Sequence, residues 1–378
     1  MKTLIVYAKA GAGHKRAAEA VYDAFKRKGR EKEVVLIDCL DYTEGWFRDF
    51  YPNCYIFLVR FLSLLWAGAY YTLDNRVIYS LVKPLRRLGN RSVSKKFVEF
   101  LKKERPEVII STQFFASEVV AALKKEKQID SKLISVVTDF GAHTFWESED
   151  VDTFVVASED TKEDLLRRNI PAEKIKVLGI PIEPPLTGLD KAQVRGEIGL
   201  KENLFTILIV GGGFGVGPIR ELAFSLDRVR LEVRDKIQLI VVCSRNEKLY
   251  SQMQVIASKL KITAKIFGFV PNLYKMMVAS DIIISKSGGL TTSEALASGL
   301  PMIIISPIPG QETKNCQLLV KNGAAYRIDR ALEVSRIIEE LIKEPAKLET
   351  MRANAQRLSR PSSADDIAEL AISYRKEG

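Results

Sequence analysis

The strongest constraint on the fold is a repeated pattern of short apolar runs, each followed by a turn and then by apolar residues at helical spacing. Such runs read as buried strands, and their alternation with helices is typical of βαβ units, which build parallel sheets. The pattern fills the first half of the chain and starts again in the second half. We therefore predict an α/β protein with two Rossmann-like domains whose parallel sheets face a central cleft. The predicted strands lie at 2–8, 33–38, 108–111, 133–137, 154–156 and 175–178, and then at 205–210, 237–242, 264–267, 281–284 and 302–305.

A proline-rich segment separates the two halves. Residues 180–185 read Ile-Pro-Ile-Glu-Pro-Pro, which can continue neither a helix nor a central strand. A length of 378 residues is enough for two domains. We predict an N-terminal domain over 1–180, a hinge and linker over 181–203 and a C-terminal domain over 204–360. The amphipathic end of the chain, 361–378, is predicted to form a helix that could pack back across the first domain.

The balance of charges limits the class of partner. Lys and Arg number 57 against 47 Asp and Glu, and the net charge of +10 attracts nucleic acid, anionic lipid or phosphorylated metabolites alike. The four cysteines are widely spaced and form no C-x-x-C pair, so we expect neither a zinc site nor a disulfide framework, and a reduced, cytosolic compartment. The apolar run at 2–8 is too short for a signal peptide.

Two histidines follow predicted strands of the first domain. His14 ends the loop Ala-Gly-Ala-Gly-His, where the glycines allow close approach of the backbone and the helix N-terminus favours negative charge. Arg16 stands where a dinucleotide-binding fingerprint needs glycine, so a dinucleotide site is disfavoured. Asp139 and His143 share a later loop and could hold an acceptor hydroxyl or orient a catalytic base. The plainer alternatives are that each histidine caps local backbone and that Asp139 forms an Asx-turn.

The second domain opens with a glycine loop. Residues 211–217 read Gly-Gly-Gly-Phe-Gly-Val-Gly directly after a strand, and their backbone amides could cradle a diphosphate. No Walker lysine follows, which disfavours an ATPase. A second strand leads into Lys-Ser-Gly-Gly-Leu at 286–290, whose amides suit a phosphate, and Glu294 can accept hydrogen bonds from ribose hydroxyls. Gln311 and Glu312 come after the next strand and suit the hydroxyls of a sugar.

Metal binding has one weak candidate in the sequence. The Asp-Val-Asp stretch at 150–152 is similar to a metal-binding D-x-D, but it precedes a strand, and we assign it to a turn. No metal site is predicted.

Together these segments resemble the monogalactosyldiacylglycerol synthase and processive diacylglycerol glucosyltransferase family, whose members have the two-domain GT-B fold. The family is more distantly related to the peptidoglycan enzyme that moves N-acetylglucosamine onto lipid I. The matching stretches run from residue 11 to 325. The resemblance implies catalytic roles for His14 as the base and for Asp139 and His143, which follow the family's T-D-[FY] motif at 138–140. It implies that the donor is bound by Gly211, Gly212, Gly213, Gly215, Phe269, Val270, Lys286, Ser287, Gly288, Gly289, Leu290, Thr291, Glu294, Gln311 and Glu312.

The resemblance also implies a reaction. A hexose, glucose or galactose, would pass from a UDP-sugar to diacylglycerol or a glycosyl-diacylglycerol with inversion, and no cofactor or metal would be required beyond the UDP-sugar co-substrate. Glu294 would hold the ribose, Gln311 and Glu312 the sugar, and 268–272 the uracil. The candidates for acceptor or membrane contact are Gly13, Trp66, Arg86, Arg87, Arg91 and Trp146.

An insertion at 46–105 is rich in aromatic residues and then in basic ones. Aromatic side chains at headgroup depth, with cations near anionic lipid, make a reversible anchor. The uncharged stretch at 61–73 has thirteen residues, short of the roughly 17–25 that a membrane-spanning helix needs, so it could touch but not cross a bilayer. We expect a peripheral protein at the cytoplasmic face of an anionic membrane. The alternative is a pair of core helices with a solvated basic face.

Other functions stay open at this stage. Nucleic acid is a weaker partner than lipid, because the aromatic residues do not interleave with the cations. The rival enzymes are a transferase of N-acetylglucosamine to another lipid and a UDP-sugar 2-epimerase of the same fold. A non-catalytic nucleotide-sugar-binding protein is the third alternative. The exact sugar, the lipid acceptor and the oligomeric state are left open by the sequence.

Overall fold

The computed structural model describes residues 2–9, 11–148, 150–185, 188–212, 215 and 217–375, which form two compact units. Unit 1 comprises Met1–Pro184, Ile308–Lys314 and Arg360–Gly378, and unit 2 comprises Pro185–Pro307 and Asn315–Ser359. The first boundary lies close to the expected end of the N-terminal domain. The short segment Ile308–Lys314 was not expected in unit 1, because it follows a strand of unit 2 in the sequence.

Unit 1 is built on a parallel sheet with the strand order β2-β1-β3-β4-β5-β6. Successive residues of a strand point to opposite faces of a sheet, so Ile5 packs with α1 on one face while Leu4 and Val6 pack with α5 and α6 on the other. The strands are β1 (Thr3–Tyr7), β2 (Val34–Asp38), β3 (Val108–Ser111), β4 (Lys132–Val136), β5 (Thr153–Val156) and β6 (Ile175–Val177). The helices are α1 (Ala12–Arg27), α2 (Gly45–Phe61), α3 (Ser63–Leu73), α4 (Arg76–Val93), α5 (Lys95–Glu104), α6 (Phe114–Lys125), α7 (Glu159–Arg167) and α17 (Ser363–Ser373), with short 3-10 turns at Glu31–Glu33, Cys39–Tyr42, Thr144–Trp146 and Ala172–Lys174.

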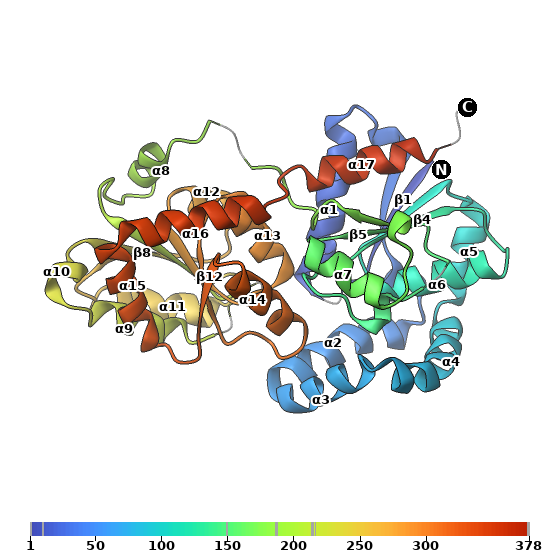
Figure 1. The fold of residues 1–378 in the computed structure, drawn as a ribbon, viewed down its shortest axis with the longest axis horizontal. Helices are drawn as coiled ribbons and strands as arrows, with labels where there is room; N and C mark the ends of the chain where they lie inside the picture. The colour runs from blue at the N-terminus through green and yellow to red at the C-terminus, as the bar shows by residue number, and fades with distance from the viewer. Residues whose placement is uncertain are drawn as a thin grey trace. The chain divides into compact units, whose positions relative to one another are not determined.

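The end of the chain belongs to unit 1. Helix α17 lies against α1 (Figure 1), and small alanine side chains of both helices meet in the apolar layer between them. Two ion pairs flank this layer, Arg27 to Asp365 at 3.0 Å and Lys28 to Glu369 at 2.6 Å.

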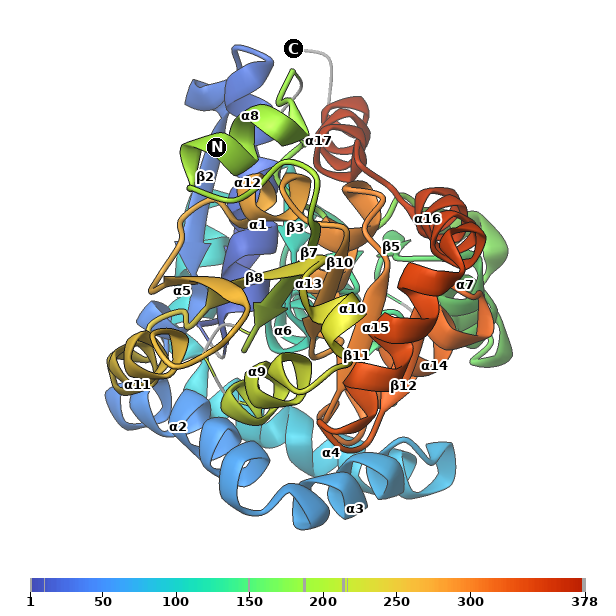
Figure 2. The ribbon, with the colours of Figure 1, turned by 90° about the vertical axis from the view of Figure 1, so that its left-hand side faces the viewer.

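The insertion folds as four helices, α2 to α5. Helices α2, α3 and α4 are neighbours and lie along one edge of unit 1 (Figures 1 and 2). Among the described residues, no single helix has the length and apolar character to cross a membrane. The pair Gly45–Val59 and Ser63–Leu73 meets that test only when taken together, and it is bent by 108°.

Unit 2 repeats the architecture with the strand order β12-β11-β10-β7-β8-β9, again all parallel. Its strands are β7 (Phe205–Val210), β8 (Ile237–Val242), β9 (Thr263–Phe267), β10 (Ile282–Ser285), β11 (Met302–Ile305) and β12 (Ala325–Ile328). Its helices are α8 (Lys191–Glu197), α9 (Ile219–Asp227), α10 (Leu231–Arg234), α11 (Glu247–Ala257), α12 (Leu273–Val278), α13 (Gly289–Ala297), α15 (Glu333–Lys343) and α16 (Pro345–Leu358), while α14 (Gln311–Lys321) starts in the segment grouped with unit 1. Strand β12 was not predicted. The α/β class with two parallel sheets is confirmed.

Candidate active site

Each sheet has one point where the order of the strands reverses. In unit 1 the chain passes from β1 to β2 on one side and later returns to β3 on the other, and in unit 2 the same happens at β7, between β8 and β10. In open parallel sheets, the crevice at the carboxyl ends of these strands is where ligands bind. The predicted catalytic histidine follows β1, and the predicted donor loops follow β7 and β10.

His14 is fixed by the loop that follows β3. Its Nδ1 lies 2.7 Å from the carbonyl oxygen of Thr112 and 3.1 Å from Oγ1 of Thr138, while the hydroxyl of Thr112 donates to the His14 carbonyl oxygen at 2.9 Å. A carbonyl oxygen can only accept a hydrogen bond, so Nδ1 carries the proton of the neutral ring. The lone pair is therefore on Nε2, which has no hydrogen-bond partner among the described residues.

Burial lowers the pKa of the His14 ring below 6.5, and the hydrogen bond to Thr112 opposes this effect only in part. The ring is therefore neutral at neutral pH, as a general base must be. These contacts give His14 the form and the tautomer of a base that takes a proton on Nε2.

His143 has a different environment, which disagrees with the predicted catalytic role. The ring is 4% exposed; Nε2 donates to the carbonyl oxygen of Tyr70 at 3.0 Å, and Nδ1 accepts from the amide of Phe145 at 3.1 Å. Both nitrogens are thus used, and burial lowers the pKa of His143 to about 4. The structure favours the plainer interpretation, in which His143 caps the 3-10 turn Thr144–Trp146.

Asp139 lies close to two tyrosines of the insertion. After burial, which is the main cause, the negative charge of Asp139 further raises the pKa values of Tyr55 and Tyr70. Tyr55 comes from α2 and Tyr70 from α3, so the loop that carries Asp139 and the insertion share one part of unit 1.

Side chains of the insertion also contact the segment that carries Gln311. The Gln311 side chain donates to the hydroxyl of Tyr55 at 2.8 Å, and Lys314 pairs with Asp74 at 2.9 Å, both within unit 1. Glu312 is buried, and it accepts from the amide of Ile308 at 2.7 Å. The residues predicted to recognise the sugar therefore lie on a segment that is fixed by polar contacts at both ends.

In unit 2, the backbone conformation of the first glycine loop favours glycine at two positions. Gly212 and Gly215 have φ angles of +65° and +59°, which favour glycine, and a Cβ at Gly215 would lie 2.3 Å from the carbonyl oxygen of Cys243. The loop is tied to the end of β8, because Ser244 donates to the Gly212 carbonyl at 2.7 Å and Asn246 to the Gly215 carbonyl at 3.0 Å. Gly211 precedes these residues at the end of β7, and the predicted donor residue Gly213 lies outside the described residues.

The second loop joins β10 to α13. Helix α13 has no acidic residue in its first turn, and no side chain caps its N-terminus, so its amides are available to an anion. The hydroxyls of Ser285 and Thr292 are buried and have no hydrogen-bond partner among the described residues. The predicted donor residues Lys286, Ser287, Gly288, Gly289, Leu290, Thr291 and Glu294 lie on this loop and on the first turns of α13.

The predicted uracil contacts lie after β9. Phe269 is 59% exposed, and the guanidinium of Arg245 stands 4.9 Å from its ring, while Val270 is half-buried beside it. Arg245 was missed by sequence analysis, because only the fold brings the segment after β8 next to Phe269. No group of three or more His, Cys, Asp or Glu side chains within the described ranges could hold a metal ion. Asp152 instead accepts from the Leu133 amide at 2.7 Å.

Two of the six predicted lipid contacts, Trp146 and Arg86, point into unit 1 and not toward solvent. Trp146 is 5% exposed and packs edge-on against Phe114 in the core. Arg86 is mostly buried, paired with Glu118 and stacked 4.5 Å from the Phe145 ring. Their partners come from distant elements, so the basic and aromatic composition of the insertion did not reveal that these two side chains point inward.

The other predicted lipid contacts are less buried. Trp66 is half-buried against Tyr55, Arg91 is exposed and pairs with Glu126 at 2.9 Å, and Gly13 is exposed. Arg87 is half-buried on α4.

Sequence analysis did not identify the most exposed apolar side chains of α4 as a candidate surface for membrane contact. Val77, Leu81, Leu85 and Leu88 are 67–77% exposed, and their spacing of three or four residues places them on one face of the helix. This set is called the α4 stripe below. The spacing is visible in the sequence and could have revealed it.

Two parallel sheets with loops for a ligand at their reversal points, His14 in one unit and glycine loops in the other, are an arrangement that suits an enzyme acting on a nucleotide-sugar. Comparisons with known proteins give the family. Residues 14–182 match the family model of monogalactosyldiacylglycerol (MGDG) synthase, and residues 206–370 match the glycosyltransferase family 28 C-terminal domain. The chain is 30% identical over 373 residues to a processive diacylglycerol beta-glucosyltransferase of Bacillus cereus, covering 98% of this chain and 93% of the relative.

A plant relative and a solved structure agree with this. Monogalactosyldiacylglycerol synthase 3 of Arabidopsis thaliana is 30% identical over 375 residues, covering 96% of this chain and 79% of the relative. The crystal structure of Acinetobacter baumannii MurG shares the fold, with a TM-score of 0.64 at 15% identity over 99% of this chain and 100% of that chain. The chain belongs to the family of processive diacylglycerol glucosyltransferases and monogalactosyldiacylglycerol synthases, and the prediction of a glycosyltransferase is confirmed.

Proposed function

We propose that this glycosyltransferase moves glucose or galactose from a UDP-sugar to diacylglycerol or a glycosyl-diacylglycerol, with inversion, while bound to the cytoplasmic surface of a membrane. The names of the relatives support the two sugars and the lipid acceptor. The observation that carries the chemistry is the tautomer of His14, whose Nε2 lone pair is set by the bond from Nδ1 to the Thr112 carbonyl.

The mechanism follows from that lone pair. His14 Nε2 takes the proton of the acceptor hydroxyl as its oxygen attacks the anomeric carbon from the face opposite to the diphosphate, so the anomeric configuration inverts. The diphosphate that leaves carries growing negative charge, which the amides of the loops after β7 and β10 stabilise. A general base of this kind contributes about 10²–10⁴ in rate.

Membrane contact is supported by exposed apolar side chains on neighbouring helices of unit 1. Besides the α4 stripe, Trp46 and Phe50 on α2 and Leu64 and Leu65 on α3 are exposed. Large exposed apolar areas of this kind mark interaction surfaces, and an amphipathic helix with cations beside its apolar face binds an anionic bilayer. Because α2, α3 and α4 are neighbours, their exposed side chains suit insertion at one lipid surface.

The test offers labelled UDP-glucose, UDP-galactose and UDP-N-acetylglucosamine to the protein with vesicles that contain diacylglycerol, in the presence of EDTA. Label from glucose or galactose should enter the lipid phase, and NMR coupling constants should show the inverted anomer. Transfer of N-acetylglucosamine alone would favour the rival lipid transferase. An epimerised sugar nucleotide with no labelled lipid would favour the 2-epimerase. Loss of transfer in EDTA that Mg²⁺ restores would overturn the metal-free part of the proposal.

A further inference from the structure

Two tyrosines of α2 lie one helical turn apart and contact different segments of unit 1. Nε2 of Gln113 donates to the hydroxyl of Tyr51 at 2.9 Å, and Nε2 of Gln311 donates to the hydroxyl of Tyr55 at 2.8 Å. Residues four positions apart share one face of a helix, so a single face of α2 contacts both glutamines. The two bonds have the same chemistry, but only the second belongs to Ile308–Lys314, called the 308–314 segment below.

Other aromatic residues of α2 face solvent. Trp46, Phe50 and Phe57 are 54–64% exposed. Tyr55 is half-buried, and its ring meets the ring of Trp66 edge-on, with 5.3 Å between the centroids. Tyr55 therefore lies on the inner side of α2 and is not part of the proposed lipid contact.

The insertion also contacts the 308–314 segment on both sides of the glutamine. Gly310 has a φ angle of +99°, and a Cβ there would lie 2.8 Å from the ring of Tyr70, so the ring packs directly on the backbone. Nζ of Lys314 lies 2.9 Å from Oδ2 of Asp74 and donates to the carbonyl oxygen of Ala142 at 3.1 Å. Helices α2 and α3 thus fix the position of this segment within unit 1.

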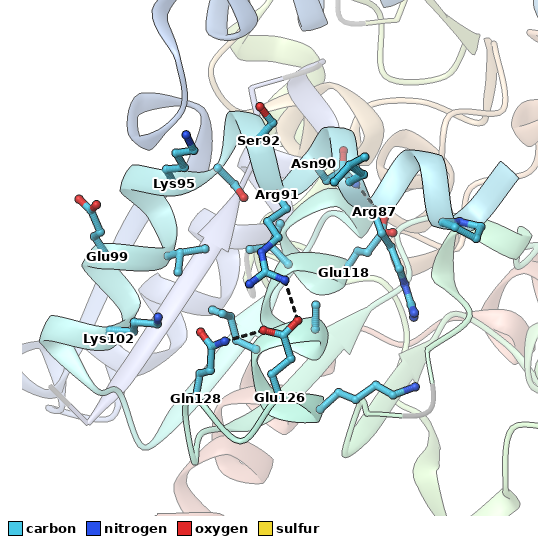
Figure 3. A pocket seen from close by; sticks show the side chains of 18 residues that line it. Arg87, Asn90, Arg91, Ser92, Lys95, Glu99, Lys102, Glu118, Glu126 and Gln128 are labelled. Atoms are coloured by element: carbon cyan, nitrogen blue, oxygen red, sulfur yellow. Dashed lines mark hydrogen bonds and ion pairs between the residues drawn. The ribbon is translucent and has the colours of Figure 1, made fainter.

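The insertion is itself fixed to α6. Beside a hollow between α4, α5 and α6, Arg91 pairs with Glu126 at 2.9 Å and Asn90 donates to Glu118 at 2.9 Å (Figure 3). Both carboxylates come from α6, which packs on the sheet of unit 1. Because α2, α3 and α4 are neighbours, they form a support for the 308–314 segment that is anchored on the sheet.

The bond to Tyr55 decides which end of the Gln311 side chain is available to a ligand. Nε2 is used by the phenol, whereas Oε1 has no hydrogen-bond partner among the described residues and keeps some access to solvent. A carboxamide rotated by half a turn would present a donor in place of this acceptor.

The surroundings of Tyr55 favour the observed orientation. Burial raises the pKa of Tyr55, the bond from Gln311 opposes this effect only in part, and the negative charges of Asp139 and Glu312 raise the pKa further. The hydroxyl therefore keeps its proton at neutral pH. Since that proton is drawn toward the two carboxylates, the phenol oxygen is left to accept from Nε2 of Gln311.

We propose that Tyr55 is a positioning residue for the sugar of the donor, because its hydroxyl orients the Gln311 carboxamide so that Oε1 accepts a hydrogen bond from a sugar hydroxyl. This role rests on the proposed function and on the expected contact between Gln311 and the sugar. The plainer alternative is that the bond only satisfies a half-buried phenol, in which case sugar binding does not depend on it.

The test compares four variants of the full chain. Tyr55→Phe removes only the hydroxyl and keeps the ring against Trp66. Tyr51→Phe is the matched control, since it breaks the same kind of bond one turn away, to Gln113. Gln311→Ala removes the carboxamide, and Tyr55→Phe with Gln311→Ala shows whether the phenol acts through it. Calorimetry measures the dissociation constants of UDP, UDP-glucose and UDP-galactose, and denaturant titration checks that each variant folds.

Tyr55→Phe should weaken the binding of at least one of the two UDP-sugars about five- to tenfold and leave the dissociation constant of UDP within about twofold. Tyr51→Phe should leave all three dissociation constants within about twofold. In the Gln311→Ala background, Tyr55→Phe should cause no further loss. Equal losses for UDP and the UDP-sugars, a similar selective loss in Tyr51→Phe, or additive losses in the double variant would overturn the proposal.

The proposed function is measured separately, as transfer of labelled sugar to diacylglycerol. If the wild type transfers sugar and Tyr55→Phe binds both UDP-sugars like the wild type, the function stands and the role of Tyr55 is overturned. If Tyr55→Phe selectively loses affinity for a UDP-sugar but the wild type transfers none to the lipid, the positioning role stands and the proposed acceptor is overturned.

Discussion

Unit 1 and unit 2 present their candidate groups at the same point of similar sheets, but they use different parts of the chain to do so. In unit 1 the group is a side chain, His14, whose ring is oriented by contacts with Thr112 and Thr138. In unit 2 the groups are backbone amides, placed by glycines with positive φ and by an uncapped helix. Removing a side chain should therefore break the first site, whereas adding a Cβ should break the second.

The largest effect is expected from His14→Ala. Loss of the base should lower kcat by about 10²–10⁴ and leave the dissociation constant of UDP within about twofold, because UDP is proposed to bind to the amides of unit 2. Steady-state kinetics and UDP titration measure the two quantities. A comparable loss of UDP affinity would show that His14 belongs to the donor site and would remove the contrast between the units.

The second prediction concerns His143 of unit 1 and its contribution to the stability of the folded chain. The unfolded chain takes up a proton on His143 near pH 6.5, but the folded chain does so only near pH 4, so unfolding is favoured as the pH falls between these values. At 1.36 kcal/mol per pKa unit, the loss approaches about 3 kcal/mol at pH 4.

Denaturant titrations of the wild type and of His143→Gln, at pH 7 and pH 5, measure this contribution. The wild type should lose more stability than the variant over that interval. Equal losses would mean that the His143 ring is accessible to protons in the folded chain, and a catalytic role would again have to be considered.

The third prediction tests the backbone site with a matched pair of glycines. Gly212→Ala and Gly215→Ala both place alanine at positive φ, but only the Cβ at position 215 meets a backbone oxygen, that of Cys243. Gly215→Ala should therefore weaken UDP binding at least tenfold, and Gly212→Ala by a smaller factor. If the two variants lose UDP affinity to a similar extent, the positive φ angle requires glycine in this loop, and the close contact with Cys243 is not the cause.

The sequence predicts the parts of both sites that depend on local pattern. Strand ends, glycine loops and the position of His14 all follow from residues that are near one another in the chain. The orientation of Arg86 and the cap role of His143 depend on Glu118 and Tyr70, which are 32 and 73 residues away. A basic or aromatic residue on an amphipathic helix can face either side of it, and only the packed partner decides which.

The smallest expected effect concerns the α4 stripe of unit 1, which we propose contacts lipid. Burying a leucine fully gains about 1.5–3 kcal/mol, but side chains at the level of the headgroups are buried only in part. The double variant Leu81→Ser with Leu85→Ser should therefore bind vesicles of phosphatidylglycerol about 3–10-fold more weakly than the wild type, as measured by sedimentation.

Unit 2 supplies the control for that measurement. Leu231 and Leu332 are 59% and 70% exposed, and Leu231→Ser with Leu332→Ser makes the same two changes at exposed leucines of the other unit. If only unit 1 contacts the bilayer, this variant should sediment like the wild type. An equal loss in both variants would mean that exposed leucine promotes vesicle binding wherever it lies. No loss in either would place the lipid contact away from α4, on the exposed aromatic residues of α2.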